Sequence, residues 1–183
     1  QTGLYLQDQI SWGKWHLLAG LRHDWSSVSG TSRRHSGEDD LRQSDKATTG
    51  RVGALYRFDS GWAPYISYAT SFEPIAGVTA EGVPFKPMKG KQAEVGIKYQ
   101  PDGANWMASA ALFDLRQTNR LTDDPIHGFP DEIQTGELRS RGLELAVTGR
   151  LSPNWSLIAS YSYLDTKVLS SEIPEEQGKP ALY

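Results

Sequence analysis

Charged side chains recur at alternate positions within several apolar-rich runs of this sequence, and they are its most reactive groups. In an extended chain, alternate residues project to opposite sides, so these charges share the face opposite the apolar residues. Such a face could form a path for an ionic ligand, or it could supply an acid and a base for hydrolysis. The residues are Arg22, Asp24, Arg51, Arg57, Glu94, Lys98, Glu144 and Arg150.

Catalysis is the weaker of these two interpretations. Glu94 and Glu144 fall in the fifth and seventh predicted strands, which are not neighbours in a meander, so they do not form the carboxylate pair of a glycosidase. The sequence also contains no GxSxG nucleophile motif. A polar ladder facing water, with opposite charges paired across strands at up to about 1 kcal/mol each, is favoured. We therefore predict that the protein is not an enzyme.

Metal binding by the protein itself is not predicted either. The chain has no Cys, and its four His lack the HExxH spacing. His16 and His23 are seven residues apart in one run, which places them on opposite faces of a strand. The acidic runs GEDD and TDDP lack the spaced ligands of an EF-hand loop. We expect no protein-bound metal and no cofactor.

Long polar segments between the runs carry the candidate ligand contacts, because loops on a rigid scaffold usually perform recognition. Aromatic and basic residues there could offer a flat surface and positive charge to an anionic ligand. Packing of the loops against one another is an equally good explanation of the aromatics. The candidates are Arg33, Arg34, His35, Phe72, Phe85, His127 and Phe129.

Period-2 alternation of apolar and polar residues predicts eight strands of about ten residues. Tight turns near residues 12, 60, 103 and 153 separate the members of each pair, and three long polar segments are predicted to be loops at the opposite end. The loops are residues 26–46, 73–90 and 116–137, and the strands lie near 3–10, 15–25, 49–58, 63–72, 92–99, 106–113, 140–151 and 155–164.

This rhythm predicts an all-β fold, an antiparallel up-and-down transmembrane β-barrel in meander order with short turns on one rim and long loops on the other. A propeller would need four strands in each repeat of about 40 to 50 residues, and only two are found. A hydrophobic fraction of 38% suits a barrel that is apolar on one face only.

Aromatic residues gather near the predicted strand ends, as expected of the two belts at the membrane interfaces. Tryptophan and tyrosine also cap strands in soluble β proteins, so the belts alone do not decide. Together with the loops they favour a membrane barrel whose apolar face contacts lipid. The belt residues are Trp12, Trp15, Trp25, Trp62, Trp106, Trp155, Tyr161 and Tyr163.

Six segments in order resemble the barrel of TonB-dependent outer-membrane receptors, in the ferric siderophore branch. The resemblance runs nearly from end to end and implies an internal piece of about eight strands from an about 22-stranded barrel. The segments are GLYLQDQI with WHLLAGLRHDW, YISYATSFEP, GVPFKPMKGKQAEVGIKY, ALFDLRQTNRLT, LRSRGLELAVTGRLSPNWSLIASYSYLDT and GKPALY.

The resemblance also implies partners and a location. It implies a bacterial outer-membrane protein that takes up a ferric siderophore, with the iron held by the chelate, and that couples to TonB through a plug. No plug precedes residue 1, so residues 1–183 are interpreted as a partial barrel domain. A net charge of -3 argues against nucleic acid. The alternatives are a TonB-dependent barrel for another cargo, such as a vitamin or sugar, and a soluble β-sheet binding protein.

Overall fold

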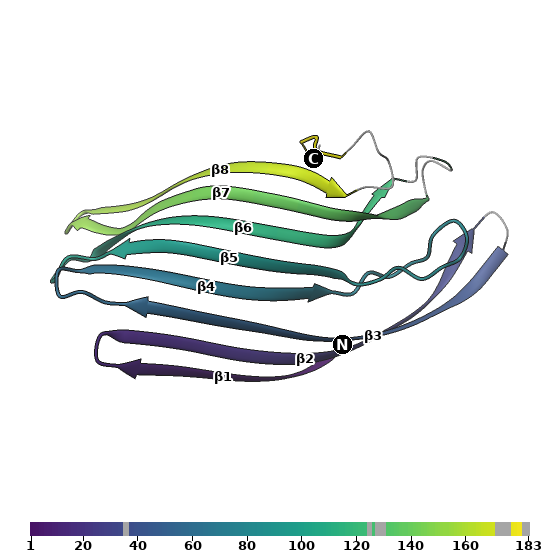
Figure 1. Cartoon of the computed structure of the whole chain (residues 1–183), viewed down its shortest axis with the longest axis horizontal. Helices are drawn as coiled ribbons and strands as arrows, with labels where there is room; N and C mark the ends of the chain where they lie inside the picture. Colours follow the sequence, from purple (N-terminus) through teal and green to yellow (C-terminus); the bar gives the residue numbers. More distant parts are fainter. Residues whose placement is uncertain (35–36, 124–125, 127–130, 171–176, 181–183) are drawn as a thin grey trace.

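A computed structural model describes residues 1–34, 37–123, 126, 131–170 and 177–180. Within these residues the chain forms one antiparallel sheet in which each strand pairs with the next along the sequence (Figure 1). The strands are β1 (Thr2–Trp12), β2 (Trp15–Arg34), β3 (Gly37–Tyr56), β4 (Trp62–Glu73), β5 (Met88–Tyr99), β6 (Trp106–Asp123), β7 (Glu132–Ser152) and β8 (Trp155–Ser170).

Tight turns join the strands at one end of the sheet, on the left in Figure 1. Trp12 pairs with Trp15, so only Gly13 and Lys14 connect β1 to β2. Gly13 has a φ of 58°, a left-handed conformation that costs glycine little and that two-residue hairpins require. The predicted meander order and the short-turn rim are both present.

The strand register divides the side chains between two faces, because directly opposed residues in an antiparallel pair project to the same side. Arg22 lies opposite Tyr5 and Thr49, and Glu144 lies opposite Ala111 and Ser162. We call the side that carries Arg22, Asp24, Arg51, Glu94, Lys98, Glu144 and Arg150 the polar face. The apolar face carries Leu6, Leu21, Val52, Ile66, Val95, Leu112 and Leu145.

Burial is inverted relative to a water-soluble sheet. Large side chains of the apolar face are exposed, with Leu6 at 77% and Ile66 at 61%. Among the strand residues whose burial the structure describes, those that are buried all belong to the polar face; they are Asp24, Ser26, Gln43, Ala111, Leu138, Ser140 and Thr166. An apolar surface of this extent on a monomer needs a partner other than water. Among the described residues, no helix is long and apolar enough to span a membrane.

Two of the three predicted loops are wrong. Residues 26–34 and 37–46 continue β2 and β3, which stay paired up to Arg34 and Gly37 as a β-hairpin that we call the first arm. Likewise β6 and β7 remain paired up to Asp123 and Glu132, forming a second arm. Both arms extend from the long-loop end in Figure 1. Outside a membrane both sides of a strand meet water, so the apolar alternation disappears while the backbone ladder continues.

Candidate functional site

A hydrogen-bonded group occupies the polar face of β4 and β5. The Tyr65 hydroxyl donates to Glu94 Oε1 at 2.7 Å, and Gln92 Nε2 donates to Glu94 Oε2 at 3.1 Å. Lys98 Nζ lies 5.2 Å from the centre of the Tyr65 ring, within reach of a cation–π contact. Both carboxylate oxygens of Glu94 are therefore engaged. The arrangement is that of a ladder of paired polar groups rather than of a free acid facing a free base.

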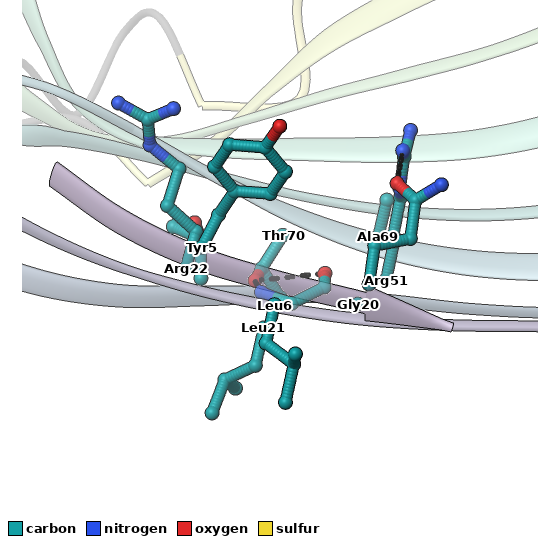
Figure 2. A pocket seen from close by; sticks show the side chains of 11 residues that line it. Tyr5, Leu6, Gly20, Leu21, Arg22, Arg51, Ala69 and Thr70 are labelled. Carbon is teal, nitrogen blue, oxygen red and sulfur yellow. Dashed lines mark hydrogen bonds between the residues drawn. The ribbon is translucent and has the colours of Figure 1, made fainter.

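Nearer the arms, strands β1 to β4 line a shallow hollow of about 290 Å³, with residues of the polar face such as Arg51 and residues of the apolar face such as Leu6 and Leu21. Figure 2 shows Tyr5, Arg22 and Arg51 standing on one side of the sheet, with Leu6 and Leu21 on the other. Gly20 lies beneath Arg51: a Cβ there would be 3.3 Å from Arg51 Cγ. Because Gly20 has no side chain, the long side chain of Arg51 can lie across β2.

The two arginines of the hollow differ in their partners. Arg22 donates from Nε and Nη2 to the two oxygens of Asp24, each at 2.7 Å, and Asp24 is only 3% exposed. Arg51 donates to the neutral side-chain oxygen of Gln7. Within the described part of the chain, Arg51 has no carboxylate in a salt bridge, so its positive charge is available to a polar or anionic group in the hollow. Arg57 lies one residue beyond β3, where its backbone N donates to Lys14 O at 2.8 Å.

The recognition candidates that the structure describes lie in three different places. Phe85 is only 5% exposed, which supports the packing explanation for this aromatic. Phe72 belongs to β4 on the apolar side, opposite Lys89, rather than to a loop. Arg33 and Arg34 lie at the tip of the first arm, paired with Glu38 and Gly37. His35, His127 and Phe129 lie outside the described residues.

Aromatic rings line the apolar face beside the short turns. Trp62 stacks on Tyr99 at 4.3 Å between ring centres, and Tyr99 meets Trp106 edge-on at 5.9 Å. Trp15 packs edge-on against Tyr56 at 5.0 Å. The remaining belt candidates, Trp12, Trp25, Trp155, Tyr161 and Tyr163, are exposed on the same face.

A turn next to these rings carries an ion pair. Lys14 in the β1–β2 turn donates to Asp59 in the β3–β4 turn, and this hydrogen bond raises the pKa of the lysine. The pair connects two adjacent turns at the short-turn rim.

Ionic residues at the arm end of the apolar face were missed by the sequence analysis. Asp114 accepts from Arg139 and Arg141, the latter at 3.0 Å, and Arg116 lies 3.4 Å from Glu137. They occupy the same alternating positions as Leu112 and Leu143, one step further along the strands. The sequence feature that could have revealed them is the change from apolar to charged residues at alternate positions of one strand, as from Leu112 to Asp114. These ion pairs mark where the apolar band ends.

No group of three or more His, Asp or Glu side chains that could hold a metal ion occurs in the part of the chain that the structure describes. His16 lies on the polar face, opposite Leu55, and His23 on the apolar face, opposite Thr48.

An exposed apolar band, bounded by aromatic rings at one end and ion pairs at the other, with polar groups across the sheet, defines a segment of a transmembrane β-barrel. Comparison with known proteins agrees with this class. The chain belongs to the family described as TonB dependent receptor-like, beta-barrel, which matches residues 1–181. Its members are receptors and transporters of the bacterial outer membrane, not enzymes.

Similar proteins include two iron-chelate receptors. The ferrioxamine B receptor of Salmonella typhimurium is 42% identical over 184 residues, which is all of this chain and 25% of that protein. The ferrichrome outer membrane transporter/phage receptor of Escherichia coli is 41% identical over 167 residues, 91% of this chain and 22% of that protein. The chain thus spans about a quarter of the length of these relatives.

Solved structures show the same fold. The alcaligin outer-membrane receptor FauA of Bordetella pertussis superposes with a TM-score of 0.71 and 27% identity, over 98% of this chain and 31% of that one. The siderophore receptor PiuA of Acinetobacter baumannii superposes with a TM-score of 0.77 at 23% identity, over 97% of this chain and 27% of that one. The predicted fold class is confirmed.

Proposed function

We propose that the complete protein is a TonB-dependent receptor that imports a ferric siderophore across the outer membrane. The observation that carries this proposal is the similarity over the whole chain to receptors named for ferrioxamine B and ferrichrome, at 42% and 41% identity. The iron arrives inside its chelate under this proposal, so the protein itself needs to supply no metal ligand.

Each surface has a role under this proposal. The arms stand on the outer side, where an arriving chelate meets them first, and the polar face lines the lumen. Polar groups such as Arg51 and Tyr5 line the path below the arms (Figure 2). In the complete receptor, energy from TonB reaches the barrel through a plug domain.

Uptake is tested with the full-length protein, produced in a strain that lacks its own siderophore receptors. We expect accumulation of radioactive iron supplied as ferrioxamine B or ferrichrome, and loss of accumulation without TonB, because import needs that energy while binding does not. A vitamin or sugar cargo would be indicated if the cells accumulated neither chelate while the receptor was assembled and exposed at the cell surface.

Charge at the tip of the first arm gives a second prediction. Replacing Arg33→Gln together with Arg34→Gln should slow association of an anionic ferric chelate by up to about tenfold, because rim charges act mainly on the association rate. Stopped-flow fluorescence on the full-length receptor measures this rate at low and high salt. Arg150→Gln, on the polar face at the opposite end, is the matched control and should leave the rate unchanged. Equal association rates for the parent and the arm variant at low salt would show that these two arginines take no part in recognising the chelate.

A further inference from the structure

The loop between β4 and β5 has its own internal structure. The backbone N of Phe85 donates to Gly77 O at 3.1 Å, and that of Thr79 donates to Val83 O at 2.8 Å. Gly82, with a φ of 82°, closes the turn by donating to Thr79 O at 2.9 Å. Residues 77–85 thus form a small closed hairpin, which makes this loop a defined element rather than an open connection.

Phe85 packs against this hairpin from within. Its ring lies over Gly77, where an added Cβ would be 3.0 Å from the ring, and Gly77 has a φ of 129°. Only glycine readily takes this backbone angle and leaves room for the ring. The loop therefore has an apolar anchor that is almost fully removed from water.

Side-chain amides from both arms hold the backbone that follows. Gln43 of the first arm donates from Nε2 to Phe85 O at 2.8 Å. Gln134 of the second arm accepts from Lys86 N at 2.7 Å and donates to Lys86 O at 2.5 Å. Asn119, with a φ of 62°, donates to Pro87 O at 2.8 Å, and its own carbonyl accepts from Gln134 Nε2 at 3.0 Å. Three consecutive loop residues are thereby bonded to two different arms.

The Gln43 bond crosses a place where the sheet ladder is interrupted. β3 pairs with β4 only from Arg51 to Leu55, although β2 and β3 continue as partners up to the arm tip. Gln43 and Gln134 both follow the alternation of the polar face, so the loop is held on the lumen side of the interruption. Among the described residues of the first arm, the Gln43 bond supplies a lateral link that the ladder lacks.

We propose that residues 77–87 are a preformed strap that joins the two arms into one rigid unit at the entrance, with Gln43, Asn119 and Gln134 as its positioning residues. The anchors are neutral amides bonded to backbone atoms, so their hold does not depend on salt or on pH near neutrality. All the described bonds of the strap join protein atoms, and the inference therefore does not depend on which cargo the receptor carries.

Distance measurements between the arms test the strap. Spin labels at Ser29→Cys on β2 and Glu132→Cys on β7, both exposed in the parent, are placed in the full-length receptor with any other cysteines replaced. Double electron–electron resonance should give one narrow distance distribution for the parent. Asn119→Ala combined with Gln134→Ala should broaden it by about twofold or more, because the described side-chain bonds of these two residues to Lys86 and Pro87 are lost.

Matched variants separate the strap from general damage. Gln117→Ala lies on β6 two residues before Asn119, makes none of the described bonds to the strap and should keep the narrow distribution. Gln134→Glu should broaden it less than the double variant does, because a carboxylate cannot donate to Lys86 O or Asn119 O but still accepts from Lys86 N, and the bond from Asn119 to Pro87 O remains. If the double variant fails to assemble, Gln43→Ala releases the strap from the first arm instead. A broad distribution in the parent, or a narrow one in an assembled strap variant, would overturn the proposal.

Discussion

Leu145→Arg should destabilise the complete barrel by about 2 to 4 kcal/mol, the cost of an arginine on the lipid side near the bilayer midplane. Leu145 is the middle of three apolar residues on the apolar face of β7, between Leu143 and Val147, and is 40% exposed. Arg141 lies two residues beyond Leu143 and marks the end of the band. Urea unfolding of the full-length barrel in lipid vesicles measures the free energy.

The adjacent residue provides the control for this substitution. Ala146 is exposed on the polar face, so Ala146→Arg should cost far less than Leu145→Arg. Cysteine labelling gives an independent readout: Glu144→Cys should react quickly with a water-soluble reagent, and Leu145→Cys should be protected. Fast labelling at position 145 with protection at 144 would falsify the assignment of the two faces.

Gly96→Ala should destabilise the barrel by about 1 to 3 kcal/mol, a cost typical of overpacking. The Tyr65 ring lies directly on Gly96, and an added Cβ would be 2.6 Å from its Cε1, Cζ and Oη atoms. Tyr65 would have to move and would lose its bond to Glu94. Equilibrium unfolding of the full-length protein provides the measurement.

Two comparisons make the Gly96 result specific. Gly53→Ala, on the polar face of β3, places its Cβ at an ordinary 3.4 Å from the nearest atom and should be neutral or slightly stabilising. Tyr65→Ser should remove most of the additional cost of Gly96→Ala in a double-mutant cycle. Independent, additive costs for the two substitutions would show that the ring and the glycine are not coupled.

The two faces could be predicted from the sequence because a strand has a period of two and each membrane-spanning run keeps it. The opposite faces of Glu94 and Val95, for example, could be assigned without knowing which strands pair with β5. The arms were mistaken for loops because residues such as Ser29 and Gln43 lie where both sides of a strand meet water, and no apolar pattern marks them.

Contacts between residues far apart in the sequence could not be predicted from local sequence patterns. Gln134 bonds to Lys86, and Gln43 bonds to Phe85, across separations of 48 and 42 residues. Nothing in the residue types distinguishes these glutamines from Gln117. Phe85 was a reasonable recognition candidate by type, but its burial depends on Gly77 and on the fold of its own loop.

The first arm has a consequence for the bacterium's exterior. β2 and β3 are each 20 residues long, whereas a strand needs only about 9 to 11 residues to cross a bilayer. Roughly half of this hairpin therefore does not need apolar side chains at alternate positions. It needs only to stay soluble and to keep its backbone pairing. Substitutions can accumulate there at little expense to membrane insertion, so the sequence of this segment can diversify while the membrane-spanning part of the barrel stays the same.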